Sequence, residues 1–263
     1  MKARYLITIC IFVSIPLSSY SQRIDTLNRT DDSGKKQGYW IKKYPSGKIQ
    51  YEGYFRDNHP AGIFKRYYDN DTLQSILFYN SNGKEAEAIF FHRNGFIAAA
   101  GKYVDQKKEG KWQFFSSLIK GYMVSEEEYS NNMRNGMSVK FFPDKTISEK
   151  THYINNLKDG EWTQYHSNGK LFTKANYSNG ILEGSFEVWD ASGRQTHKGQ
   201  YKNDRRDGIW YIYNPDGSVK SEIKYSGGVA LNPEYYLKEN AWLDSLEQAG
   251  KKVSDPEKTG SIW

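Results

Sequence analysis

Residues 199–210 read GQYKNDRRDGIW, and they contain a phrase that recurs along most of the chain. Its opening glycine, Gly208, is followed two residues later by Trp210 and, after three more, by a second aromatic, Tyr213. Successive openers are 24 residues apart except at one interval of 26, and they fall at Gly38, Gly62, Ala86, Gly110, Gly136, Gly160, Gly184 and Gly208. A fixed period of this size indicates a repeat array rather than a globular enzyme fold.

Each unit reads as strand, turn, strand. With the opener as place zero, place two is aromatic at Trp40, Phe64, Trp112, Trp162, Phe186 and Trp210. Place seventeen, shifted by the insertion in the fourth unit, is Phe55, Tyr79, Tyr103, Tyr129, Tyr153, Tyr177, Tyr201 and Tyr225. Between these places lie turn sequences such as Ser167-Asn168-Gly169, whose glycine supplies the positive backbone angle of a tight hairpin. We interpret both sets of aromatics as the framework of the repeat.

In the second half of each unit, apolar and polar residues alternate with a period of two, which predicts a strand with one apolar and one wet face. Place fifteen is usually small, as at Gly53 and Gly199, and leaves room for a ring from the neighbouring strand. Short connections make sequential strands antiparallel neighbours. The sequence therefore predicts an all-β fold, an elongated antiparallel meander of about sixteen strands over residues 38–231.

Composition agrees with such an array. Only 37% of residues are hydrophobic, yet 16% are aromatic, and disordered chains are poor in aromatics. The formal net charge of +6 is mild, with acids interleaved among bases, so we expect no nucleic-acid partner.

The two ends depart from the period. Residues 1–21 have a basic start, an apolar run from Leu6 to Leu17 and a small-x-small site before Gln22, which predicts a secretory signal peptide, an exported protein and no transmembrane span after cleavage. Lipidation at Cys10 is the alternative. Residues 22–37 form a polar leader, in which the turn at 31–34 is a candidate degenerate half-repeat.

At the other end, residues 232–250 start with Asn232-Pro233-Glu234 and carry an apolar stripe, which predicts a helix. We expect it to cover the last strand; a docking helix for a partner is the alternative. Residues 251–263 form a tail.

Catalytic chemistry leaves no signature. The five histidines lack zinc-site spacing, Asp69-Asn70-Asp71 occupies a turn place, and no phosphate-binding glycine loop or serine elbow occurs. We expect no enzyme activity, no metal and no cofactor. The fourth unit, with its insertion, and the degenerate place two at Ser138 form the candidate interaction patch, for which we name Tyr122, Glu126, Glu127, Glu128 and Ser138. A slipped hairpin without function is the alternative for this unit.

The pattern Gly199, Tyr201, Asp207, Gly208, Trp210 resembles the MORN repeat, and more closely its bacterial variant in the YwqK family antitoxin group. The resemblance covers residues 38–231 and implies a bacterial protein built of hairpin repeats. Three functions stay open: a non-enzymatic exported scaffold in the periplasm, on the outer envelope or outside the cell, binding a protein or envelope component; a glycan-binding module; and, as the family name implies, an antitoxin. Buried tryptophans at 40, 112, 162 and 210 would exclude the glycan hypothesis as stated, because sugar stacking needs exposed rings.

Overall fold

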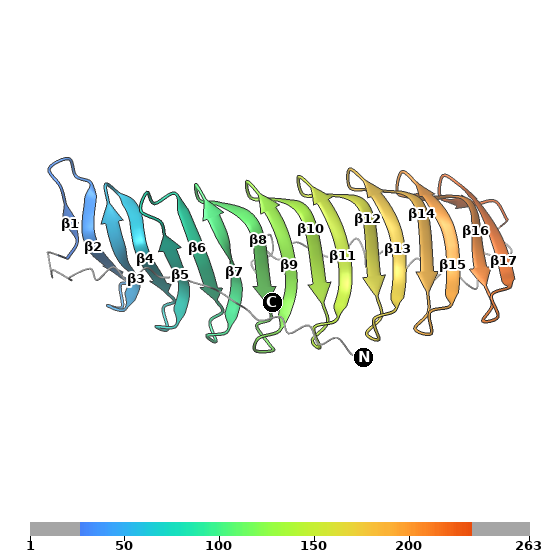
Figure 1. The fold of residues 1–263 in the computed structure, drawn as a ribbon, viewed down its shortest axis with the longest axis horizontal. Coiled ribbons are helices and arrows are strands. Elements are labelled where there is room, and N and C mark those ends of the chain that lie inside the picture. The colour runs from blue at the N-terminus through green and yellow to red at the C-terminus, as the bar shows by residue number, and fades with distance from the viewer. Residues whose placement is uncertain (1–26, 233–263) are drawn as a thin grey trace.

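The computed structural model describes residues 27–232, which form one open and elongated antiparallel sheet (Figure 1). Each strand pairs with its sequence neighbours, and most strands are seven to nine residues long. In chain order they are β1 (Arg29–Thr30), β2 (Lys36–Lys43), β3 (Ile49–Arg56), β4 (His59–Tyr67), β5 (Leu73–Tyr79), β6 (Glu85–Phe91), β7 (Ile97–Val104), β8 (Lys107–Phe115), β9 (Met123–Ser130), β10 (Met133–Phe141), β11 (Ile147–Ile154), β12 (Leu157–Tyr165), β13 (Leu171–Ser178), β14 (Ile181–Trp189), β15 (Gln195–Lys202), β16 (Arg205–Tyr213), β17 (Val219–Ser226) and β18 (Val229–Ala230). The predicted all-β meander is confirmed, with β2–β17 as its two strands per repeat.

The predicted signal peptide at residues 1–21, the helix from Pro233 to Gly250 and the tail at 251–263 lie outside the described residues. The polar leader is corrected in part. Residues 29–30 and 36–37 belong to the sheet, because β1 pairs with the start of β2. Asp31 Oδ1 accepts hydrogen bonds from the backbone N–H groups of Ser33 and Lys35 and closes the turn between them.

Two kinds of turn alternate along the chain and define two long edges of the sheet. The first-turn edge, at the bottom of Figure 1, is formed by the connections from each even-numbered strand to the next odd-numbered one, such as residues 166–170. The second-turn edge consists mostly of two-residue turns with positive φ at both residues, such as Asn155 (49°) and Asn156 (70°). These connections are short, because residues 157–159 already lie in β12.

The second turns also tie each repeat to the one before it. Asn156 donates its backbone N–H to the carbonyl of Arg134, and its side-chain Oδ1 accepts from the N–H of Arg134. Asn58 with Lys36, and Asn132 with Lys108, make the same pair of bonds. These turn side chains satisfy backbone groups of the preceding unit.

The opening glycine produces a bulge. In β11–β12, Thr151 pairs with Trp162 and Tyr153 with Lys158, so three residues centred on Gly160 face the single residue between them. Gly160 has φ of 90°, a conformation that glycine adopts without penalty. In β5–β6, where Ala86 replaces the glycine, the ladder runs without a register shift.

The place-two rings lie on one face of the sheet, which we call the ring face. On it, Trp112 lies over Gly101 and Trp210 over Gly199, so closely that a Cβ at either glycine would overlap the indole. Both indoles donate to a backbone carbonyl, of Lys102 and of Gln200. The expectation that a small place fifteen receives a neighbouring ring is confirmed.

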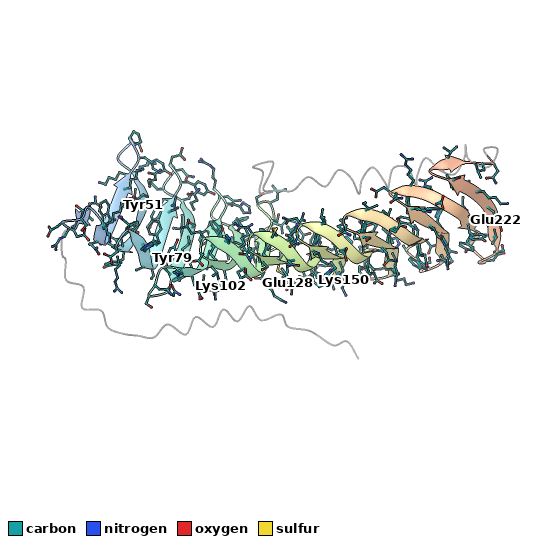
Figure 2. All side chains as sticks on the ribbon, turned by 90° about the horizontal axis from the view of Figure 1, so that it is seen from above. Tyr51, Tyr79, Lys102, Glu128, Lys150 and Glu222 are labelled. Atoms are coloured by element: carbon teal, nitrogen blue, oxygen red, sulfur yellow. The ribbon has the colours of Figure 1, made fainter. Side chains whose placement is uncertain are left out.

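The expected wet face is not uniformly wet. Places two and five are an odd number of residues apart, so the place-five rings point to the opposite face. There Tyr67 and Tyr39 both donate to the carboxylate of Glu52, each at 2.7 Å. Burial and this hydrogen bond raise the pKa of Tyr67 to about 12. Side chains project from both faces along the whole array (Figure 2). The predicted apolar and wet faces therefore describe the second strand of each unit, whereas the first strands add aromatic rings to the second face.

The buried core on the ring face falls into two clusters. One contains Ala88, Ala99, Trp112 and Tyr129; the other extends from Trp162 to Tyr225. Between the clusters the row of place-two and place-fifteen residues is polar: Glu127 pairs with Ser138, and Ser138 with Thr151. We call this segment, with Lys140 and Glu149, the polar break.

Asparagine amides extend the strand pairing at both ends of the sheet. Asn28 donates its side-chain N–H to the carbonyl of Ile41 and accepts from the N–H of Ile41, beyond the two residues of β1. Asn232 makes the equivalent bonds to Glu222 and Lys224 of β17. The side chain expected to cap a helix thus satisfies the last strand, and part of each edge is blocked against pairing with another chain.

Candidate functional site

The two-residue insertion of the fourth unit lengthens the turn between β8 and β9. Ser116 organises it: its Oγ accepts from the N–H groups of Leu118 and Ile119, each at 3.1 Å. The N–H of Tyr122 donates to the carbonyl of Ile119, and the side-chain amide of Asn94 donates to the carbonyl of Ser117. Hydrogen bonds to its backbone groups therefore fix the turn, and its apolar side chains do not pack into the core of the sheet.

Those side chains are the most unusual feature of the first-turn edge. Leu118 is 87% exposed and Ile119 50% exposed, and we call the pair the apolar knob. The corresponding tips elsewhere are small, polar or proline, such as 45–46, 69–70, 167–168 and 215–216. This exposed apolar pair on a fixed turn makes the knob a candidate contact site.

Positive charge accompanies the knob. Lys120 lies in the same turn, with its Nζ 6.0 Å from the ring centroid of Phe96. The adjacent turns carry Lys145 and Arg93, the latter paired with Asp69 at 2.7 Å. The surroundings of the knob are thus mildly basic.

The structure does not bring the five predicted patch residues together. Glu127 and Ser138 are paired on the ring face, where the carboxylate of Glu127 accepts from Ser125 and Tyr129. Glu126 and Glu128 point to the opposite face: Glu126 pairs with Lys111 at 3.0 Å, and Glu128 accepts from the N–H of Met137. Tyr122 donates to the carbonyl of Phe141, as Tyr44 does to Tyr67. The predicted patch is therefore split, and most of its members have structural partners.

The irregular fourth unit can be recognised in the sequence, but the knob within it was not predicted. The signal was present, because the insertion adds Leu118 and Ile119 where the other units carry turn residues. The predicted patch was centred instead on the run of Glu126, Glu127 and Glu128. Consecutive residues of a strand point to opposite faces, so such a run does not form one patch.

Glu149 is the buried centre of the polar break. Its side chain is 12% exposed and accepts from Lys140 Nζ at 2.9 Å, Gln164 Nε2 at 3.2 Å and Thr151 Oγ1 at 3.4 Å. Burial acts to raise the pKa of Glu149, but the charge and hydrogen bond of Lys140, helped by Lys158 and Gln164, outweigh it and hold the pKa below its usual value. Burial in turn lowers the pKa of Lys158, which lies between the rings of Trp162 and Tyr177.

Replacing Glu149 by Gln is expected to destabilise the protein by about 1–3 kcal/mol at pH 7, because Lys140 loses a charged acceptor in a poorly hydrated site. A carboxyl with a depressed folded-state pKa stabilises above its unfolded pKa of about 4.3 and loses that effect as the pH falls through the folded value. The difference in urea unfolding free energy between wild type and variant should therefore shrink below about pH 4. Glu161→Gln, at an exposed site paired with Lys174, is the matched control, and an equal loss there would contradict the role of Glu149.

Three of the four framework tryptophans are buried, which bears on the glycan hypothesis. Trp112 and Trp210 are 1% exposed and Trp162 is 7% exposed, so their faces are covered by protein. Trp40, at the end of the array, is half-buried. Cations cover several rings: Lys108 Nζ lies 5.0 Å from the ring centroid of Trp112, and the Arg206 guanidinium 5.3 Å from that of Trp210. Sugar stacking needs an exposed ring, so it is excluded for Trp112, Trp162 and Trp210.

Histidines at place six serve the framework. His92 Nε2 lies 3.0 Å from the carbonyl oxygen of Phe115, and His166 Nε2 lies 2.9 Å from that of Trp189. Since a carbonyl only accepts, each ring donates from Nε2, as the hydroxyl of Tyr68 does to Phe91. Both imidazole rings therefore hydrogen-bond to the backbone of the next unit. Within residues 27–232 no group of three or more His, Cys, Asp or Glu side chains is placed to hold a metal ion.

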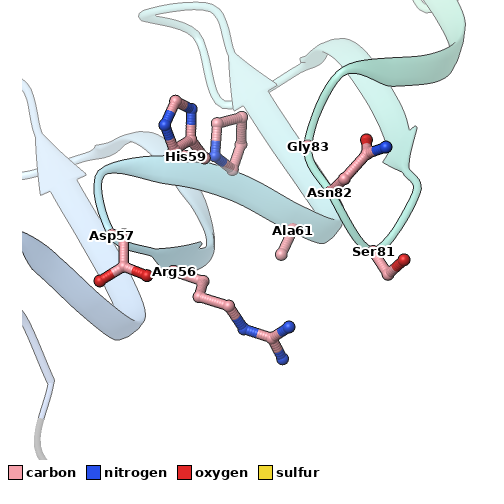
Figure 3. A pocket seen from close by; sticks show the side chains of 8 residues that line it. Arg56, Asp57, His59, Ala61, Ser81, Asn82 and Gly83 are labelled. Atoms are coloured by element: carbon pink, nitrogen blue, oxygen red, sulfur yellow. The ribbon is translucent and has the colours of Figure 1, made fainter.

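Two hollows mark the edges of the sheet. On the second-turn edge, a small one of about 150 Å³ lies between Arg56, His59 and the loop of Ser81 and Asn82, beside the ladder that lacks its bulge (Figure 3). Its side-chain polar groups are exposed. On the first-turn edge, a hollow of about 420 Å³ is lined mainly by apolar surface, including Phe172, Trp189 and Ala191. Of the two, the second has the chemistry to receive an apolar side chain.

Comparison with known families agrees with the repeat geometry. Four segments match the model described as MORN repeat variant: residues 36–57, 61–81, 158–179 and 206–226. They make up about a third of the chain, and each spans parts of a strand–turn–strand unit. These matches support a MORN repeat protein.

Solved structures offer only remote similarity. A chain in the crystal structure of TcdB2-TccC3 is 9% identical with a TM-score of 0.19, covering 76% of this chain and 13% of that chain. A chain of a Tc holotoxin pore from Photorhabdus luminescens is 14% identical with a TM-score of 0.19, covering 71% and 11%. This chain thus spans about an eighth of their length, and scores this low say nothing about its action. No curated protein matches the chain.

Among residues 27–232 no helix is long and apolar enough to cross a membrane.

Proposed function

We propose that this protein is a non-enzymatic, exported scaffold, which holds a protein partner or envelope component through the fourth-unit turn. The observation that carries the proposal is the apolar knob, because Leu118 is 87% exposed on a turn whose backbone is fixed by hydrogen bonds. Repeat arrays present extended surfaces and vary at the units that bind. Export rests on the sequence of residues 1–21 and a bacterial origin on the resemblance.

Replacing Leu118 and Ile119 together by serine is expected to change the unfolding free energy by no more than about 0.5 kcal/mol, because both side chains are exposed. The same variant should lose capture of its partner from envelope extract, while wild type retains it after crosslinking. Thermal unfolding checks the first expectation and a pull-down checks the second.

The control for the pull-down is Ser46→Ala, which changes an exposed tip of another first turn. If the knob variant and the control capture the same proteins in equal amounts, the knob is not the docking site. A glycan array probed with the same proteins tests the alternative function of a glycan-binding module. Retention of glycans alone, with no protein crosslink, would favour the glycan-binding module.

Localisation needs a separate measurement. Fractionation and mass spectrometry of the native protein should find it outside the cytoplasm and starting at Gln22. An uncleaved protein found only in the cytosol would overturn the exported role and favour the antitoxin function that the YwqK resemblance implies.

A further inference from the structure

The hollow at the first-turn edge is built from two neighbouring units. Phe172 of β13 packs against the ring of His166, with 4.7 Å between centroids. Trp189 at the end of β14 forms another wall, and its carbonyl accepts from His166 Nε2. Ala191 lies at the exposed rim. The hollow of about 420 Å³ is larger than a leucine side chain and consists mainly of apolar surface.

The knob and the hollow lie on the same edge of the same sheet. The knob belongs to the fourth unit, between β8 and β9, and the hollow to the sixth and seventh units, around β13 and β14 (Figure 1). At about 4.8 Å between neighbouring strands, they are roughly 24 Å apart along the array. Within one molecule they cannot meet, because both belong to one continuous ladder.

A two-fold axis brings them together between molecules. Rotation about an axis perpendicular to the sheet, midway between knob and hollow, turns a second first-turn edge toward the first. It places each knob on the hollow of the other copy, so one arrangement makes two equal contacts. A closed two-fold interface of this kind is the commonest form of homodimer.

Charge and edge geometry favour the same arrangement. The same rotation sets the β6–β7 turn, which carries Arg93, opposite the turns after β14 and β16, which carry Asp190 and Asp216. Asp190 is paired with Arg194, whereas Asp216 is exposed and accepts hydrogen bonds from Ser218 of its own turn. The end strands are partly blocked by Asn28 and Asn232, which leaves a turn edge available for association.

From these observations we propose that the fourth-unit turn binds a second copy of this chain, whose hollow at Phe172, Trp189 and Ala191 receives Leu118. The inference rests on the proposed function, because it names the partner of the same turn. With two small contacts, the dimer is expected to be weak and concentration-dependent.

Sedimentation of the chain from Gln22 to Trp263 over a range of concentrations tests the proposal. Wild type is expected to show a monomer–dimer equilibrium. Leu118→Ser and Ala191→Lys, each at an exposed site, should each raise the dissociation constant by about tenfold or more, since losing one buried apolar contact costs at least about a factor of ten. Ser46→Lys, at an equally exposed turn tip, should leave the dissociation constant unchanged.

Mixing the two variants gives the sharper result. An equimolar mixture retains one intact knob and one intact hollow on different chains. It should therefore dimerise more tightly than either variant alone and less tightly than wild type. A mixture that associates no better than the separate variants would overturn the pairing of knob and hollow.

The same experiments separate this inference from the proposed function. Wild type that sediments as a monomer at every concentration, while envelope capture still depends on Leu118, overturns the dimer and leaves the scaffold intact. If wild type is monomeric at every concentration and envelope capture does not depend on Leu118, both the dimer and the proposed function are overturned.

Discussion

Trp210→Ala is expected to lower the free energy of unfolding by about 3–5 kcal/mol, the range for removing a fully buried indole. Trp210 is 1% exposed and contacts Phe186, Tyr201 and Tyr225, with ring centroids 5.7, 5.2 and 6.1 Å away. The variant also loses the indole N–H bond to the carbonyl of Gln200 and part of the surface over Arg206. Urea unfolding followed by circular dichroism measures the loss.

Because a repeat array is stabilised by neighbouring units, the damage should be local. Amide hydrogen exchange is expected to show lost protection in β14–β17 before β6–β9, whose separate cluster is centred on Trp112. Trp40→Ala is the control at a half-buried place two, where Phe55 is at 6.1 Å, and it should cost clearly less. Equal losses at the two positions would contradict the assignment of Trp210 to the core.

Gly199→Ala is expected to destabilise the protein by about 1–3 kcal/mol or more, although it adds a single methyl group. That methyl would overlap the Trp210 ring, and the indole cannot shift without losing its bond to Gln200. Lys198→Ala, one residue earlier on the exposed opposite face, should change stability little. Thermal and urea unfolding of both variants measure the difference.

The chain already contains the compensating pair. In the preceding repeat Ala175 lies opposite Phe186, so adding Trp210→Phe to Gly199→Ala should recover part of the loss. Trp162 shows the cost of placing a tryptophan opposite a residue larger than glycine. It lies opposite Thr151, and its indole N–H, buried within the described structure, has no hydrogen-bond partner. A double variant less stable than both single variants would overturn the argument that ring and small residue are matched.

Period and turn chemistry were enough to predict the architecture. The 24-residue spacing defines the unit, and asparagine and glycine in the turns specify antiparallel neighbours, as confirmed by the ladder from β2 to β17. The opposite-face rings could also have been predicted, because Trp162 and Tyr165 are separated by an odd number of strand positions. The bulge at Gly160 was harder to predict, because it depends on how three residues fit against one on the neighbouring strand.

The candidate site was predictable only to the level of its unit. A two-residue insertion shows in the sequence, but the exposure of Leu118 depends on the turn that Ser116 and Asn94 hold in three dimensions. The hollow was not predictable, since Phe172 and Trp189 come from different repeats and meet only across the sheet. The pairing of Glu149 with Lys140 likewise joins two strands across a turn.

Photocrosslinking in the native envelope tests whether this array acts through the fourth-unit turn. A photoreactive amino acid at position 118 is expected to crosslink to a protein, and one at position 46, an exposed tip of another first turn, is expected to give no such product. A crosslink to a second copy of the chain would additionally support the dimer. Absence of any product specific to position 118, from a folded and correctly localised protein, would mean that the array does not act through this turn.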